Sequence, residues 1–351
     1  MLLRCSSLLF IAVVAACGGS SSADPDSAVV IDDAALIDAN AFDAPVPDAV
    51  VPDARPLADA GIPSGAHYQY VINTITIPTT ASQASQCGLN IDGDPLGRVD
   101  NAVGQVVAAL GGAGGANPQP PMDQALADGS TLHLLDVQAD SLVDDSFVSL
   151  RQFFGDDADM PANPSDNYSG TENFDVRSDS PTDTLVGGPI NTSNLQLGPG
   201  ELFVKMVAFP GSPPIIIPLA AVHMTGAITA TEITDGILGG AITESDVDTI
   251  MIPAMAVSVQ GAVAADCGGT SPNCCDPGST GETIVGFFDT NSDCLVSEQE
   301  VRDNALLNSL IAPDVDLFDA GGAFNPNSDG VNDALSVGVC FTAVGAVFTL
   351  P

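Results

Sequence analysis

The chain has 351 residues and a formal net charge of −38, with 45 acidic and seven basic side chains, and Lys205 is its one lysine. Proteins bind nucleic acids through clustered Lys and Arg that replace the counterions of the phosphates, so this composition excludes a nucleic-acid partner. Aspartate greatly outnumbers glutamate. That bias is typical of turns, caps and loops that hold hard cations, rather than of long helices.

The N-terminus has the features of a secretory signal. A single positive charge precedes an apolar stretch, residues 8–16, which is shorter than the roughly 20 residues of a membrane-spanning helix. Residues 14–17, Val-Ala-Ala-Cys, resemble the lipobox of bacterial lipoproteins. This resemblance implies removal of the signal peptide 1–16, lipidation of Cys17 and attachment to a membrane. The alternative is an ordinary signal peptide that is cut after residue 16.

The residue after the predicted anchor indicates the location. Gly18 stands where similar lipoproteins carry the aspartate that retains them in the inner membrane. We therefore expect Cys17 to attach the protein to the outer membrane or the cell surface.

The segment that follows, residues 17–61, is predicted to be a disordered stalk. It is rich in Ala, Asp and Pro, and Asp-Ala pairs recur every five residues, a period that matches neither a strand nor a helix. Like charges repel along it, and there is too little large apolar surface to offset the entropy of ordering.

Residues 62–279 carry mostly strand patterns. Alternating or β-rich stretches bounded by Gly, Pro or Asp predict strands at His67–Pro78, Leu132–Val137, Ser146–Phe154, Glu201–Phe209 and Ala221–Ile233. The apolar run Pro213–Val222 is interrupted by proline and is predicted to be a buried or edge strand.

Helices are fewer. Apolar residues at helical spacing predict a helix at Asp100–Leu110, with Asp100 as its N-cap, and a second at Thr243–Val263 that bends at Pro253. We expect a mainly β (α+β) fold, with a sandwich-like β domain and a few packed helices. An EF-hand-like helix-loop-helix module, residues 280–351, is expected to follow it.

Six cysteines remain when Cys5 of the signal and Cys17 are set aside. They are Cys87, Cys267, Cys274, Cys275, Cys294 and Cys340. An even number in an exported chain predicts three disulfides, and the adjacent Cys274 and Cys275 are expected to bond to different partners. A zinc site is the alternative, but the paired spacings of zinc ligands are absent.

Residues 289–300 read Asp-Thr-Asn-Ser-Asp-Cys-Leu-Val-Ser-Glu-Gln-Glu and lie between predicted helices at 282–288 and 300–311. This pattern resembles the calcium loop of EF-hand and dockerin-type proteins. The resemblance assigns Ca²⁺ ligands to Asp289, Asn291, Asp293, the carbonyl of Leu295, Ser297 and Glu300.

One position of this loop departs from the pattern. Position 6 is normally Gly, because the turn needs a positive φ, and here it is Cys294. A disulfide through Cys294 is one way to hold the turn. A helix cap without metal is the alternative interpretation of the whole segment.

Two weaker loops carry similar residues. One offers Asn325, Asn327, Asp329 and Asp333 as ligands, with Gly330 at position 6 but Ser336 where an acid is expected; the other offers Asn90, Asp92, Asp94 and Asp100. Ordinary surface turns are the alternative for both, since Asn, Asp and Gly are common turn residues.

No catalytic array is visible. The three histidines form no metal-protease motif, and there is no nucleophile elbow or phosphate-binding loop. We expect a non-enzymatic, lipid-anchored cell-surface protein, stabilised by Ca²⁺, with a binding or structural role toward a protein or glycan partner. The alternatives are a secreted hydrolase of polysaccharide or peptide with structural calcium, and a dockerin-like docking module.

Overall fold

The computed structural model describes residues 65–112, 117–182, 184–207 and 214–351. These residues fall within one compact unit. The predicted signal peptide 1–16, the predicted lipidation site Cys17 and the predicted stalk up to residue 61 lie outside the described residues.

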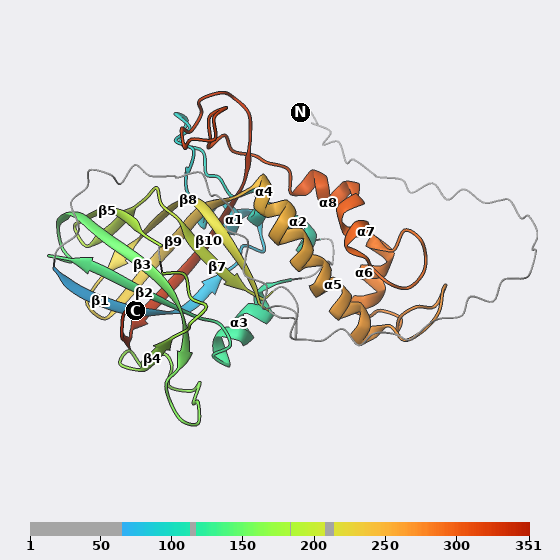
Figure 1. The fold of residues 1–351 in the computed structure, drawn as a ribbon, viewed down its shortest axis with the longest axis horizontal. Coiled ribbons are helices and arrows are strands. Elements are labelled where there is room, and N and C mark those ends of the chain that lie inside the picture. The colour runs from blue at the N-terminus through green and yellow to red at the C-terminus, as the bar shows by residue number, and fades with distance from the viewer. Residues whose placement is uncertain (1–64, 113–116, 183, 208–213) are drawn as a thin grey trace, which may run out of the picture. The chain divides into compact units, whose positions relative to one another are not determined.

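Eight antiparallel strands form a closed barrel (Figure 1). In order around the wall they are β1 (Ala66–Thr76), β2 (Leu132–Ala139), β3 (Asp145–Asp157), β5 (Val186–Asn191), β6 (Asn194–Leu197), β8 (Ile215–Ile228), β9 (Glu232–Thr243) and β10 (Ala334–Gly345), which pairs with β1 again.

The prediction of a sandwich is therefore wrong, although the mainly β composition is confirmed. The sheet closes because β3 pairs with β5 as well as with β2. Alternating residues give one buried face in a sandwich and in a barrel alike, so the pattern could not distinguish them. The choice depends on pairings between strands that are distant in sequence.

Two long strands, β3 and β8, each pair with several other strands. Residues 145–150 of β3 pair with β5, and residues 155–157 pair with the short strand β4 (Asn173–Val176). In the same way, residues 215–219 of β8 pair with β7 (Leu202–Met206), and residues 224–227 pair with β6. A final strand, β11 (Val347–Phe348), runs parallel to β4.

The barrel interior is the main apolar core. It contains buried residues of several strands, such as Tyr70, Leu135, Leu150, Met224 and Phe341. A smaller cluster on the other face of β1, β2 and β3 is covered by β4 and β11, and it includes Val71, Leu134, Phe153, Phe174 and Phe348. Each face of these strands is thus buried over part of its length.

The helices are mostly short. They are α1 (Ala81–Gln86), α2 (Ala102–Gly112), α3 (Gln119–Ala127), α4 (Glu244–Asp246), α5 (Ile252–Asp266), α6 (Thr280–Phe288), α7 (Glu298–Asp303) and α8 (Ala305–Leu310). A π-helical turn, η2 (Val247–Met251), joins α4 to α5.

The predicted helix beginning at Thr243 is confirmed as the continuous run from α4 to α5. Thr243 caps it, because its hydroxyl accepts a hydrogen bond from the N–H of Asp246. The π-helical turn ends at Met251, two residues before Pro253, whose ring would clash with the carbonyl of residue 249 in regular α-helical geometry. By length and composition alone this helix could span a membrane, but Ala256, Val259 and Val263 are buried in the fold.

Asn101, rather than the predicted Asp100, caps α2. Its Oδ1 accepts hydrogen bonds from the N–H groups of Gly104 and Gly338, and its Nδ2 donates to the carbonyls of Ala84, Cys87 and Gly338. Gly338 of β10 permits this approach, since a Cβ there would lie 2.2 Å from the carbonyl oxygen of Cys87. Asn101 thus attaches α1 and α2 to the barrel.

Candidate functional site

An apolar pocket of about 220 Å³ lies at one end of the barrel. It is found where β1 and β9 end and where β8 and β10 begin, and α2 and α5 lie beside that end (Figure 1). Its lining is Ile77, Pro78, Val103, Gly104, Val107, Pro118, Val204, Met206, Ile215, Ile217, Leu219, Leu238, Ile242, Met251, Met255, Val337, Gly338 and Val339.

The sequence builds this lining from two periodicities. Alternate residues of the strands face the pocket, as with Ile215, Ile217 and Leu219 of β8. Met251 and Met255, which are four residues apart along one helical run, also face the pocket. No side chain in the lining can donate or accept a strong hydrogen bond, so binding here depends on the hydrophobic effect and dispersion alone.

A buried polar cluster holds β7, which forms one wall of the pocket. The side-chain amide of Gln152 donates to Nδ1 of His133 at 3.0 Å and accepts the N–H of Phe203 at 3.0 Å. Nε2 of His133 lies 3.0 Å from the carbonyl oxygen of Lys205 and must donate to it. Through these side-chain hydrogen bonds, His133 of β2 and Gln152 of β3 hold the backbone of β7 in place.

The cluster also fixes the protonation state of His133. Nδ1 accepts a hydrogen bond from Gln152 while Nε2 donates one to Lys205, and only the neutral ring, protonated at Nε2 alone, does both. His133 is fully buried, and burial lowers its pKa to about 4.

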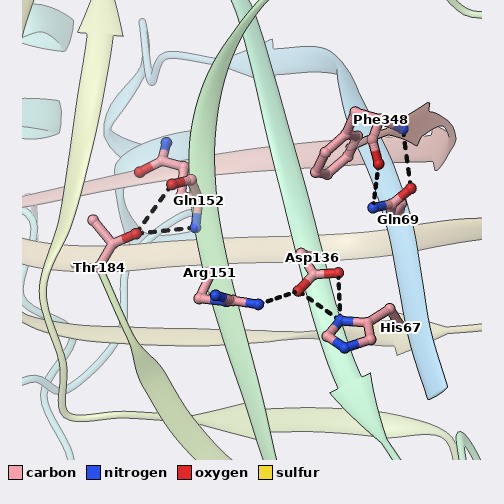
Figure 2. A network of polar contacts seen from close by, with 7 residues as sticks. All are labelled: His67, Gln69, Asp136, Arg151, Gln152, Thr184 and Phe348. Atoms are coloured by element: carbon pink, nitrogen blue, oxygen red, sulfur yellow. Dashed lines mark hydrogen bonds and ion pairs between the residues drawn. The ribbon is translucent and has the colours of Figure 1, made fainter. Parts of the chain in front are cut away.

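A second polar group lies on the other face of β2. Figure 2 shows Asp136 between His67, whose Nδ1 is 3.0 Å from both carboxylate oxygens, and Arg151, which donates to Oδ2 at 3.3 Å. Asp136 is buried and alternates with Leu135 and Val137 of the interior, so it faces away from the pocket. The paired charges stabilise the outer wall of β1, β2 and β3.

The three predicted disulfides are confirmed. They join Cys87 to Cys340, Cys267 to Cys275, and Cys274 to Cys294. Adjacent Cys274 and Cys275 do bond to different partners, and the bond from Cys294 ties the predicted calcium loop to the segment after α5.

In the 289–300 loop, the backbone turns at Cys294. Cys294 has φ 69°. The carboxylate of Asp289 accepts the N–H groups of Asp293 and Cys294, and Asp293 accepts the N–H of Leu295. Residues 289–297 lie between α6 and α7, and residues 298–300 form the first turn of α7.

The end of this loop is a helix cap. Glu300 and Ser297 form a capping box at the start of α7, and Glu300 also accepts the N–H of Thr290. Burial alone would raise the pKa of Glu300, but these donors outweigh it and the pKa is lowered. The predicted exiting helix is divided into α7 and α8 at Asn304, whose side chain caps α8.

The two weaker loops lie together. The side-chain amide of Asn327 donates to the carbonyl of Asp92 at 2.7 Å. Asp92 and Asp94 hold their own turns through backbone N–H groups, as does Asp329. Asn90 bonds twice to the backbone of Asp94, and Asn325 donates its N–H to the carbonyl of Leu317.

Three carboxyls near these two loops, those of Asp100, Asp314 and Asp333, have raised pKa values. Burial raises the pKa of Asp314 and outweighs the hydrogen bonds from Ser336. Burial raises the pKa of Asp100 to about 6, with a contribution from the charge of Asp92. Burial and the charges of Asp316 and Asp329 also raise the pKa of Asp333, outweighing the N–H groups of residues 317 and 318 that its oxygens accept.

The carboxylates are spread out. Within the part of the chain that the structure describes, no three His, Cys, Asp or Glu side chains lie close enough together to hold a metal ion by themselves. Calcium at any of the three loops would therefore need amide, hydroxyl and backbone carbonyl oxygens as well, which are the ligands such loops use.

Sequence reasoning did not identify the pocket or the polar cluster beside it. The one signal was the apolar run at residues 213–222, which forms the start of β8 and contributes Ile215, Ile217 and Leu219 to the lining. Comparison with protein families, with characterised proteins and with solved structures gives no match.

Proposed function

We propose that this chain is a lipid-anchored cell-surface protein whose barrel binds a small apolar molecule, a medium-length aliphatic chain. The observation that supports the proposal is the pocket at the barrel end, with its wholly apolar lining. Ligand sites are commonly apolar and concave and are often found in the mouths of β-barrels. Cys17 as the anchor, and calcium bound at the 289–300 loop, remain part of this proposal.

The volume of the pocket sets the size of the ligand. A dry cavity of about 150 Å³ lined by apolar side chains holds benzene. At the same volume per carbon atom, the pocket of about 220 Å³ holds about nine carbon atoms. A longer molecule would extend beyond the pocket.

The lining also indicates the chemistry of the ligand. It contains no aromatic side chain to stack on a ring, and three methionines, Met206, Met251 and Met255, can adapt to a flexible chain. A polar end group would have to stay in water, because nothing in the lining can hydrogen-bond to it. The net charge of −38 repels anions, so a neutral end group is favoured over a carboxylate.

Binding rather than catalysis is proposed because of the same lining. Proton transfer needs a titratable side chain in reach of the ligand, and every lining residue is apolar. His133 and Gln152 lie nearby, but each uses its polar atoms to hold β7.

Titration calorimetry with nonanol tests the proposal. The full chain carrying Cys17→Ser needs no detergent, whose alkyl chains would compete for the pocket. We expect saturable binding of one nonanol per chain, weaker binding of pentanol, and weaker binding of nonanoate than of nonanol.

Two variants of α5 provide the matched comparison. Met255→Trp fills the pocket and should abolish nonanol binding, whereas Val257→Trp, at a position that is 41% exposed, should leave it unchanged. Equal binding by both variants, or no saturable binding by the parent chain, would refute the proposed function.

A further inference from the structure

The connections before α2 and before β10 lie side by side. In Figure 1 the chain between α1 and α2 runs next to the chain between α8 and β10, and the hydrogen bond from Asn327 to Asp92 joins them. Apolar residues below the junction, including Ile91, Val315 and Leu317, pack on Ala220 and Ala241 of the barrel. The junction is therefore a fixed part of the fold.

Asp316 lies at the buried side of this junction, between Val315 and Leu317 of the apolar cluster. Its side chain is 4% exposed, and Oδ2 accepts the N–H of Gly330 at 2.7 Å. Oδ1 is buried and accepts no hydrogen bond from the described residues. An unsatisfied buried carboxylate oxygen is costly unless a cation or another donor compensates it.

No basic side chain of the described residues compensates this charge. The four arginines in the described part of the chain pair with other acids: Arg98 with Asp94, Arg151 with Asp136, Arg177 with Asp156 and Asp179, and Arg302 with Asp248 and Glu298. Lys205 donates to the carbonyl of Ser130. The charges of Asp316 and Asp329 instead both act on a third acid, Asp333, whose pKa they help to raise.

The hydrogen bonds of this junction repeat those of the 289–300 loop. There, Asp289 accepts the N–H of Cys294, and Asp293 accepts the N–H of Leu295 at 2.8 Å. Here, Asp316 accepts the N–H of Gly330, and Asp329 accepts the N–H of Val331 at 2.9 Å. Cys294 and Gly330 have similar positive φ angles, 69° and 75°.

Asp316 thus occupies the place that the sequence pattern gave to Asn325. It comes from outside the contiguous loop, nine residues earlier in the chain, which is why the pattern does not show it. Asn325 is neutral, whereas Asp316 supplies the charge that the first position of a calcium loop requires.

We propose that Asp316 and Asp329 form a Ca²⁺ site at this junction, completed by amide and backbone carbonyl oxygens of residues 327–333. The donors are all oxygen, which suits a hard cation, and no thiolate or imidazole belongs to the group. The open, mixed set of donors favours Ca²⁺ over Mg²⁺, which needs near-ideal octahedral geometry. This site is separate from the apolar pocket and from the 289–300 loop.

Calorimetric titration with CaCl₂ tests this site in the EGTA-treated full chain carrying Cys17→Ser. Glu300→Gln is added to remove the bidentate ligand of the 289–300 loop. We expect this background to bind one calcium ion, and Asp316→Asn to weaken that binding at least about tenfold. Asp175→Asn, which removes an exposed charge from β4, should leave the affinity unchanged.

Asp329→Asn covers the case in which Asp316→Asn does not fold, because the Asp329 side chain is exposed. It should weaken calcium binding in the same way. Absence of calcium binding in the Glu300→Gln background, or unchanged binding in Asp316→Asn or Asp329→Asn, would overturn the proposal.

Discussion

His133 has the most unusual surroundings of any titratable residue near the pocket. It is buried, and both ring nitrogens bond to fixed partners, the amide of Gln152 and the carbonyl of Lys205. Protonation would place a second donor against the Gln152 amide and a charge in the barrel interior. The ring therefore stays neutral while the fold is intact.

This predicts how stability depends on pH. The pKa of His133 is about 4 when folded, against an ordinary value of 6.5. As the pH falls below 6.5, the unfolded chain takes up a proton that the folded chain does not, so stability is lost until about pH 4. His133 should destabilise the fold by about 2–3 kcal/mol between about pH 7 and about pH 4.5.

Urea unfolding of the parent chain and of His133→Gln at both pH values checks this prediction. Other groups, including Asp100, also titrate in this range, and the difference between the two chains removes their contribution. The parent chain should lose more stability than the variant. Equal losses would mean that His133 is not the neutral buried group described above.

Residue-level sequence reasoning succeeded where the signal was local. Cys274 and Cys275 are too close to bond with each other easily, and they bond to different partners as expected. It failed at Asp316, whose partner Gly330 is 14 residues away. No spacing rule connects the two positions, because only the folded chain brings them together.

Among the elements, the predicted strands were found where alternation was clear, as in β1, β2 and β3. The predicted strand Ala221–Ile233 is instead the end of β8, a turn and the start of β9. Residues 229–231 are Thr-Ala-Thr. They include no Gly, Pro, Asn or Asp, the residues from which a turn is predicted, so the sequence did not indicate a turn here.

The turn at Cys294 yields a prediction for the disulfide and for backbone strain. Cys294 has a positive φ, which costs a residue with a Cβ about 1–2 kcal/mol. Its bond to Cys274 closes a loop with a sequence separation of 20, which stabilises the fold by about 3 kcal/mol.

Two double variants separate these effects. Cys274→Ser/Cys294→Ser should be about 3 kcal/mol less stable than the parent chain, whereas Cys274→Ser/Cys294→Gly should recover about 1 kcal/mol of that loss. Both are measured by urea unfolding without calcium. If the glycine variant were no more stable than the serine variant, the turn would not carry this strain.

For the whole molecule, closure of the barrel was beyond sequence reasoning. β1 pairs with β10, more than 260 residues away in the chain, and the predicted module 280–351 supplies β10 to the barrel wall. The same closure creates the pocket, since its lining comes from β7, β8, β9 and β10, from the residues that follow β1, from Pro118, and from α2, η2 and α5. Local pattern showed that these residues are buried but not that they surround a space.

Ligand binding should stabilise the whole barrel. A ligand at about 100 times its dissociation constant that binds only the folded state adds about 2.7 kcal/mol to the free energy of unfolding. Nonanol should therefore raise the melting temperature of the parent chain and of Val257→Trp, measured by differential scanning calorimetry. A similar rise in Met255→Trp would show that nonanol acts elsewhere on the molecule.

The most direct test of the account is a crystal structure of the chain with a bromine-labelled medium-chain alcohol, in which anomalous scattering locates the bromine. We predict one strong bromine peak in the pocket, between Leu238 of β9 and Met255 of α5. Bromine found only on the outer surface, with the pocket closed by its own side chains, would contradict the proposed function.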